Sequence, residues 1–214
     1  MTKFCVIGLG KFGYHIAEEL ARTGGDVLGV DASEARVAAI RDIIAQSVCT
    51  EIVDENSLHA IGIKGIDIVI VALGRNFGQS VLITQLLKKN FEIPMVIVRA
   101  TNAIERDILE TLGADQVILP EDEAATRLAD SLNSPFPAII RITNDFSIVQ
   151  LVPPAKFVGK TIEELFIRET YGVECLAIKR DEHTLLATFE QRVGEDDILF
   201  FAGNNGSLQS LAKL

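Results

Sequence analysis

The sequence of 214 residues contains no tryptophan and only three cysteines, and aromatic side chains make up 6% of it. Cys5, Cys49 and Cys175 are odd in number and far apart, which argues against a disulfide framework. Cys5 lies within an apolar segment and the other two lie beside apolar segments, so we predict reduced cysteines that serve as packing residues. The cysteines and histidines show no spacing typical of a metal site.

Positive charge and long apolar segments are also scarce. The chain has 20 lysines and arginines against 30 aspartates and glutamates, and its net charge of −10 argues against binding nucleic acid or an acidic membrane surface. No apolar stretch approaches the roughly 18 residues of a membrane-spanning helix, and residues 66–73 (IDIVIVAL) predict a strand. The first apolar segment begins close to Met1, which leaves no room for a signal peptide. We therefore expect a cytoplasmic protein, able to sit against a membrane protein.

Residues 3–31, KFCVIGLGKFGYHIAEELARTGGDVLGVD, carry the most informative pattern of the chain. An apolar strand leads into a glycine turn, an amphipathic helix follows, and a second apolar strand ends in Asp31. This order of strand, G-x-G-x-x-G, helix, strand and acid is the dinucleotide-binding fingerprint in its structural context. The sequence therefore predicts a nucleotide site, with a purely structural glycine turn as the alternative.

Each residue of the fingerprint has a physical role. Gly8 permits the tight turn, Gly10 lets the backbone approach a phosphate, and Gly13 allows close packing of the helix on the strand. The helix N-terminus offers free N–H groups and the positive end of a dipole to an anion. Asp31 is placed to accept hydrogen bonds from ribose hydroxyls, which disfavours NADP because the 2′-phosphate would meet its charge.

The alternation of strands and helices continues and predicts an α/β, Rossmann-like doubly wound parallel sheet. Ligands of such sheets bind beyond the carboxyl ends of the strands. The further strands are predicted at 46–49, 67–72, 95–98 and 116–119, and the helices at 34–44, 55–61, 76–89, 102–112 and 121–132.

Residues 133–137 (NSPFP) interrupt this rhythm and predict a domain boundary. We therefore divide the chain into residues 1–134 and 135–214, the second part being a small α+β domain. Its strands are predicted at 138–142, 147–152, 173–179, 185–188 and 198–202, and its short helices at 161–166 and 208–213.

Several segments together resemble the regulator-of-K⁺-conductance (RCK) domain family, and the whole chain is similar to the cytosolic regulatory subunits of Ktr/Trk bacterial potassium-uptake systems. The resemblance covers nearly the whole chain. It rests on VIGLGKFG (6–13), GVDAS (29–33), DIVIVALGRNFGQS (67–80), VIVRA (96–100), LGADQVILPE (112–121), SIVQLVPPAKFVGKTIEEL (147–165) and GEDDILFFAG (194–203).

The resemblance implies ligand-controlled gating and no catalysis. Subunits of this family form homodimers that assemble into an octameric ring on the cytoplasmic face of the membrane. There they control a separate K⁺-translocating membrane subunit in response to ATP and ADP. An NAD(H)-sensing regulator of the Trk type is the alternative, because Asp31 serves an adenosine ribose in ATP, ADP and NAD alike.

The fingerprint, the strand ends and the resemblance together predict the nucleotide-binding residues. They are Gly8, Leu9, Gly10, Lys11, Phe12, Gly13, Asp31, Ala32, Ser33, Glu51, Ala72, Leu73, Gly74, Asn76 and Arg99.

Four of these side chains have a plain structural alternative. Lys11 stands where relatives usually have an arginine that reaches the terminal phosphate, but it can also be a solvated lysine. Arg99 matches a basic position near ribose and phosphates, or it forms a surface ion pair. Glu51 matches a polar residue near the adenine amine, or it is an exposed loop residue, and Asn76 can be a helix N-cap.

Two further ligands follow from the resemblance alone. Glu121 matches a glutamate that helps to bind a cation, Mg²⁺ or another, at the dimer interface; alternatively the helix dipole favours it in a first turn. Some relatives bind cyclic di-AMP between two copies of the C-terminal domain. Ile162, Phe166, Ile167 and Val173 would line that cleft, or they form ordinary core.

An enzyme is the main rival interpretation, since a nicotinamide-dependent dehydrogenase would share the fingerprint. Such an enzyme needs an acid/base near the hydride site. The only tyrosines are Tyr14 and Tyr171, and neither begins the Tyr-x-x-x-Lys pattern of short-chain dehydrogenases, because Glu18 and Cys175 stand at the lysine position. A nucleotide-sensing repressor would need a basic winged-helix segment, which the sequence does not contain.

Overall fold

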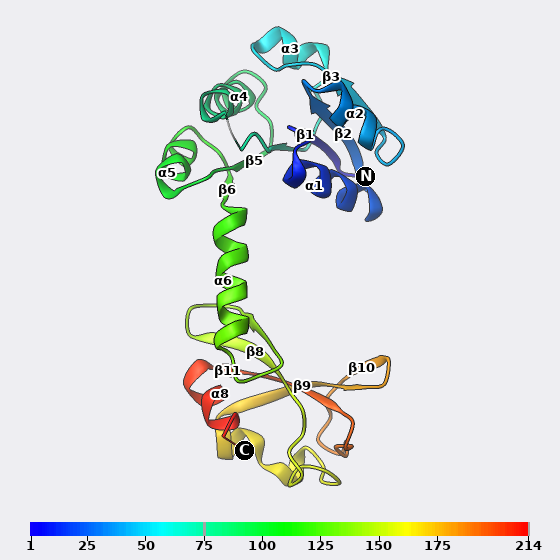
Figure 1. Cartoon of the computed structure of the whole chain (residues 1–214), viewed down its shortest axis with the longest axis vertical. Helices are drawn as coiled ribbons and strands as arrows, with labels where there is room; N and C mark the ends of the chain where they lie inside the picture. The colour runs from blue at the N-terminus through cyan, green and yellow to red at the C-terminus, as the bar shows by residue number, and fades with distance from the viewer. Residues whose placement is uncertain (75, 214) are drawn as a thin grey trace. The chain divides into compact units, whose positions relative to one another are not determined.

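The computed structural model describes residues 1–74 and 76–213. The chain forms two compact units, Met1–Glu121 and Asp122–Leu214. In Figure 1 the first unit runs from blue to green and the second from green to red. Helix α6 (Pro120–Asn133) begins at the end of the first unit and continues into the second. The predicted boundary after residue 134 stays a prediction, and α6 contributes no buried residue to either unit.

The N-terminal unit is a parallel sheet covered on both faces, as predicted. The strand order is β3-β2-β1-β4-β5-β6, the doubly wound order in which the chain returns to the centre after β3. The strands are β1 (Lys3–Ile7), β2 (Asp26–Asp31), β3 (Gln46–Cys49), β4 (Ile68–Val71), β5 (Met95–Arg99) and β6 (Gln116–Ile118).

Two apolar layers fill this unit, one on each face of the sheet. Helices α1 (Lys11–Arg22) and α2 (Glu34–Ile40) contribute Ala17, Val37 and Ile40 to one layer. The opposite layer contains residues of α3 (Glu55–Ala60), α4 (Phe77–Lys89) and α5 (Ala103–Thr111). Figure 1 shows these helices on the two sides of the sheet. The central strands are apolar along their length because both of their faces are buried.

Helix boundaries in this unit follow local chemistry. Asn102 caps α5 by accepting a hydrogen bond from the N–H of Glu105 at 3.0 Å, as predicted. Helix α2 is shorter than the predicted 34–44 and ends at Ile40. The chain turns there because Ile44 is buried, and the tip of Ile44 lies against Gly29 of β2.

The C-terminal unit is an antiparallel sheet with the order β10-β9-β11-β8-β7. Its core gathers apolar residues such as Phe136, Val149, Ile178 and Phe201. The strands are β7 (Ala138–Arg141), β8 (Phe146–Leu151), β9 (Val173–Arg180), β10 (His183–Leu186) and β11 (Ile198–Asn204).

Helices of this unit differ from the prediction in extent. Residues 161–166 were expected to form a helix, but only a 3₁₀ turn (η1, Glu163–Leu165) is present. Phe166 then adopts a left-handed conformation with φ of 45°, and α7 (Ile167–Tyr171), which was not predicted, begins after it. Helix α8 (Asn205–Leu211) starts three residues before the predicted 208–213, because Asn205 bonds Ser147 and the carbonyl of Asn144.

The cysteines are free, but their burial differs from the prediction at one position. Cys5 and Cys175 are buried, and burial raises the pKa of each thiol to about 12. Cys49 is exposed, so its prediction as a packing residue is wrong. It lies on β3, an edge strand whose outer flank no neighbouring strand covers. No helix within the described ranges combines the length and the apolar character that crossing a membrane requires.

Candidate functional site

The glycine turn between β1 and α1 has the geometry that the fingerprint predicts. Gly8 has φ of 96°, and a Cβ there would lie 2.9 Å from the side chain of Leu73. A Cβ on Gly13 would come within 1.8 Å of the carbonyl oxygen of Gly8, so the helix can approach the strand only with glycine here. Gly10 faces open space and is the N-cap of α1. The first-turn N–H groups of α1 therefore point to a place that an anion can enter.

Asp31 is a buried polar residue beside the glycine turn, and its side chain is 6% exposed. One carboxylate oxygen accepts the N–H of Leu9 at 2.7 Å and the guanidinium of Arg36 at 3.2 Å. The other oxygen accepts the N–H of Ser33 at 2.8 Å. Asp31 therefore holds the glycine turn in shape and can also bind ribose. Lone pairs remain on a carboxylate that accepts three hydrogen bonds.

A cleft of about 150 Å³ opens beside Asp31 at the carboxyl ends of β1, β2 and β3. We call it the β2 cleft. It brings together five of the predicted residues. Its lining also includes three polar residues that the sequence analysis missed: Arg36, Thr50 and Gln79. The predicted residues in its wall are Gly8, Asp31, Ala32, Glu51 and Leu73.

A second group of predicted residues meets near the first turn of α1. The guanidinium of Arg99, at the end of β5, lies 5.8 Å from the ring centre of Phe12. It also crosses the backbone of Gly74, where a Cβ would lie 2.2 Å from an Arg99 nitrogen. Arg99 forms an ion pair with Glu121 in the first turn of α6. We call Phe12, Gly74, Arg99 and Glu121 the Arg99 cluster.

Two predicted side chains, those of Asn76 and Lys11, take positions that match their structural alternatives. Asn76 caps α4 by accepting the N–H of Gln79 at 3.2 Å, and its side-chain amide also bonds Gln79. Ser33 is the N-cap of α2, where its backbone N–H bonds Asp31. Lys11 is exposed at the first position of α1, beside the open space at Gly10. Their predicted roles toward a nucleotide stay predictions.

Within residues 1–74 and 76–213, no three histidine, cysteine or acidic side chains gather where they could hold a metal ion. Among the described residues, Glu121 is the carboxylate that pairs with Arg99. A cation there would therefore need further oxygens, such as those of a bound phosphate or of a second chain.

Two hollows lie in the C-terminal unit. A cleft of about 330 Å³ is lined by Ile162, Phe166, Ile167 and Val173, the four residues predicted as walls for a cyclic dinucleotide. Only Phe166 is strongly exposed, at 61%, so the other three also serve the core, which was the alternative.

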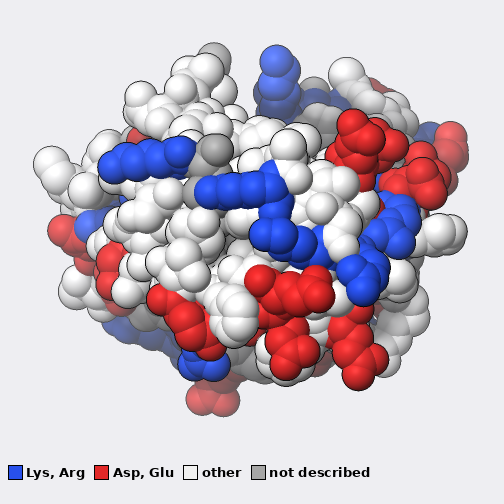
Figure 2. Space-filling view, turned by 90° about the horizontal axis from the view of Figure 1, so that it is seen from below, with Lys and Arg blue, Asp and Glu red and all other residues white. Residues whose placement is uncertain are grey.

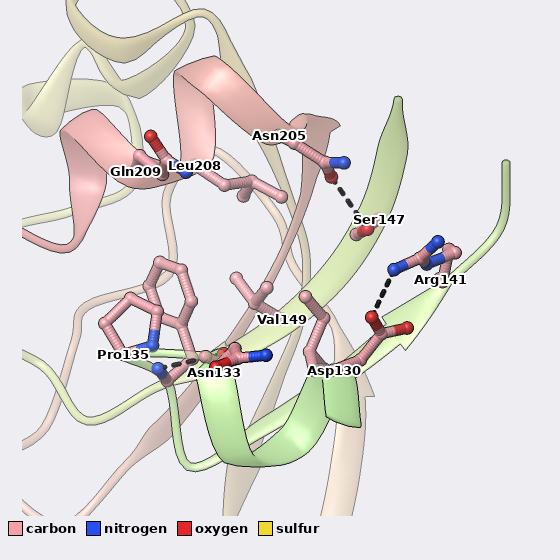
Figure 3. Close-up of a pocket in the computed structure, with 12 residues that line it drawn as sticks. Asp130, Asn133, Pro135, Arg141, Ser147, Val149, Asn205, Leu208 and Gln209 are labelled. Atoms are coloured by element: carbon pink, nitrogen blue, oxygen red, sulfur yellow. Dashed lines mark hydrogen bonds and ion pairs between the residues drawn. The ribbon is translucent and has the colours of Figure 1, made fainter. Parts of the chain in front are cut away.

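The second hollow, of about 180 Å³, lies between the end of α6, β7, β8 and α8 (Figure 3). Val149 and Leu208 point into it, and Arg141 pairs with Asp130 at its rim. Ser147 donates a hydrogen bond to Asn205 at 2.8 Å. Arg141 and Arg99 both pair with a carboxylate, but the unpartnered buried Nε among the described residues belongs to Arg99.

Figure 2 shows one face of the molecule, on which basic and acidic side chains are mixed. On the face shown in Figure 2, lysines and arginines form a short band that acidic side chains border. A polyanion on this face would meet acidic groups beside the basic ones, in a chain whose net charge is −10.

These features define a class of protein: a Rossmann-type nucleotide-binding domain followed by a small antiparallel domain. Comparison with known proteins agrees with the class. Residues 4–120 match the TrkA-N domain family, and residues 146–214 match the TrkA-C domain family. The chain therefore belongs to the TrkA-N/TrkA-C family of RCK regulatory proteins, as the sequence predicted.

Relatives extend over almost the whole chain. It is 36% identical over 209 residues to Ktr system potassium uptake protein A of Bacillus subtilis (strain 168), covering 97% of this chain and 94% of the relative. It is 31% identical over 204 residues to Ktr system potassium uptake protein C of the same organism, covering 94% and 92%.

Among solved structures, the GsuK channel bound to NAD matches all of this chain with a TM-score of 0.59 at 21% identity. The chain spans only 38% of that channel, and the likeness shows the shared fold.

Proposed function

We propose that this chain is the cytoplasmic, nucleotide-controlled regulatory subunit of a potassium uptake system and is not itself an enzyme. The observation that carries the proposal is the glycine turn tied to Asp31 by the Leu9 N–H, with open space at Gly10. The relatives that match along nearly the whole chain bear the name of potassium uptake proteins.

The ligand is a nucleotide, with ATP and ADP as the proposed pair and NAD(H) as the alternative. The β2 cleft would take ribose and adenine, with Asp31 accepting hydrogen bonds from the ribose hydroxyls. The α1 N-terminus, Lys11 and Arg99 would face the phosphates. Glu121 would join a cation to the phosphates at the contact between two subunits.

The ring and the membrane partner belong to the same proposal. Homodimers would assemble into an octameric ring that docks on a K⁺-translocating membrane subunit. A nucleotide shifts a gate only if it binds two ring states with different affinity. ATP and ADP must therefore stabilise different shapes of the ring. The C-terminal cleft lined by Phe166 would take cyclic di-AMP as a second effector.

The decisive measurement is K⁺ flux through vesicles that contain the membrane subunit, with this chain added together with ATP or ADP. We expect the two nucleotides to give different fluxes, and Asp31→Ala to abolish the difference. Equal flux with either nucleotide at saturating protein would contradict gating. Mass spectrometry of the nucleotide released from the purified chain separates the ATP/ADP proposal from the NAD(H) alternative.

A further inference from the structure

The Arg99 cluster contains a mostly buried guanidinium whose ion-pair partner is largely exposed. Arg99 is a mostly buried side chain, 19% exposed, whereas its partner Glu121 is 67% exposed. The Nε of Arg99 is a buried donor with no hydrogen-bond partner among the described residues. Buried donors in native proteins nearly always have an acceptor. The guanidinium therefore has room for one more acceptor than the described residues supply.

The position of Arg99 decides what that acceptor is. Its guanidinium lies between Phe12, in the first turn of α1, and Gly74, after β4. Because Phe12 belongs to the first turn of α1, the end of the helix that carries free N–H groups lies near Arg99. A bidentate anion held by the glycine turn would use Nε together with Nη2, and it would compete with Glu121 because the Glu121 carboxylate already occupies Nη2. Arginine binds phosphate and carboxylate with the same fork of N–H donors, so the two acceptors are chemically interchangeable.

We propose that Glu121 is a built-in competitor of the nucleotide phosphates: it latches Arg99 while the site is empty and is displaced when phosphate binds. This inference rests on the proposed nucleotide function and adds a positioning role for Glu121 that precedes any contact with a cation. Glu121 belongs to the first turn of α6, the helix that leads into the C-terminal unit. Displacement of its carboxylate therefore frees the start of that helix from the sheet when phosphate arrives.

The direction in which Glu121→Gln changes ATP affinity separates this role from that of a cation ligand. With divalent cations removed by EDTA, Glu121→Gln should bind ATP roughly two- to five-fold more tightly than the parent, since a half-exposed ion pair contributes little. A cation ligand would show no effect in EDTA and a loss when cation is added. The matched control is Glu123→Gln, which makes the same charge change on the same helix at a side chain that forms no ion pair with any described residue. It should leave ATP affinity unchanged.

Three readouts test whether the gain acts through Arg99 and phosphate. Adenosine, which lacks phosphate, should bind Glu121→Gln and the parent equally. The gain should disappear in an Arg99→Gln background and persist in Arg99→Lys, which keeps the charge. It should also shrink as salt rises from 0.05 M to 0.5 M, because screening weakens the competing pair.

The outcomes are distinguishable by isothermal calorimetry on the full chain. A gain for ATP that needs Arg99 supports the latch. Equal ATP affinities in EDTA for the parent, Glu121→Gln and Glu123→Gln would overturn it while leaving nucleotide binding intact, as would a gain that survives in Arg99→Gln. A parent chain that binds neither ATP, ADP nor NAD would overturn the proposed function and the latch together.

Discussion

Each unit of the chain contains a buried aspartate paired with an arginine that is about half exposed, yet the two pairs are built differently. In the C-terminal unit, Arg180 grips Asp197 with two N–H groups at 2.8 Å each, and the N–H of Gly194 adds a third hydrogen bond at 2.6 Å. In the N-terminal unit, Arg36 reaches Asp31 with a single nitrogen at 3.2 Å.

The difference separates a structural carboxylate from one that is ready for a ligand. The bidentate grip on Asp197 uses both oxygens and joins β9 to the turn before β11. Asp31 is held chiefly by the backbone N–H groups of Leu9 and Ser33, which fix its position. Its partner Arg36 contributes a single hydrogen bond of 3.2 Å and lines the open β2 cleft. A carboxylate oriented by backbone donors keeps capacity for ribose hydroxyls, because Arg36 can move away at little cost.

The largest expected effect is on the structural pair. Asp197→Ala should lower the free energy of unfolding by about 2–3 kcal/mol, because it leaves the Gly194 N–H and Arg180 without their buried acceptor. Urea denaturation of the full chain measures the loss, and faster amide exchange in β9 and β11 would locate it. Asp196→Ala, an exposed neighbour, is the control. If both variants are equally stable, the pair contributes nothing to stability.

Substitution of Asp31, the aspartate of the N-terminal pair, should change the affinity for nucleotides. Asp31→Ala should weaken ATP and ADP by at least about tenfold, since hydrogen bonds to a charged group contribute about 1.5–3 kcal/mol. Part of this loss comes from the Leu9 N–H, which then has no acceptor to hold the glycine turn. Asp26→Ala removes an aspartate from the opposite end of the same strand and should leave affinity unchanged. Calorimetry with equal affinities for the parent and Asp31→Ala would remove Asp31 from the site.

Local patterns allowed much of this to be predicted. The glycine turn and Asp31 are specified by residues close in sequence, so their geometry follows from the fingerprint. Continuous apolar strands predicted the sheet, because a strand buried on both faces needs apolar residues throughout. The capping role of Asn102 was equally local.

Contacts between distant segments were not predictable in the same way. The pairing of Arg99 with Glu121 depends on where α6 begins relative to β5, and neither residue shows its partner in the sequence. Arg36 belongs to an exposed helix face, where arginine is ordinary, and only its place five positions after Asp31 could have indicated a contact. Cys49 was expected to pack because it lies beside apolar residues. It belongs to β3, which is an edge strand and pairs with a neighbouring strand on one side. Helix α7 was missed because a left-handed phenylalanine separates it from η1.

The free energy of unfolding at low pH should depend on Asp197. Its hydrogen bonds from Arg180 lower the pKa of the carboxyl below the ordinary value of 3.8, with a further contribution from the Gly194 N–H. A carboxyl with a lowered folded-state pKa stabilises the fold above its unfolded pKa, and this stabilisation is lost as pH falls toward the folded value. The parent should therefore lose stability below about pH 4 more steeply than Asp197→Asn. Parallel stability curves from pH 7 to pH 2.5 would contradict this assignment.

The smallest expected effect concerns Lys11, which lies exposed at the first position of α1, beside Gly10. If its ammonium reaches the terminal phosphate, Lys11→Ala should weaken ATP by a few-fold, about 0.5–1 kcal/mol, and ADP by less. Lys11→Arg should strengthen ATP selectively, because a guanidinium can bind phosphate with two N–H groups where an ammonium acts as a point charge. Lys3→Ala, at the amino end of β1, controls for the loss of one positive charge far from the strand ends. Competition between ATP and ADP on each variant measures the ratio directly. Equal losses for the two nucleotides would show that Lys11 is a solvated residue at a helix start, and the discrimination would then fall to Arg99, which is already positioned by Phe12 and Gly74.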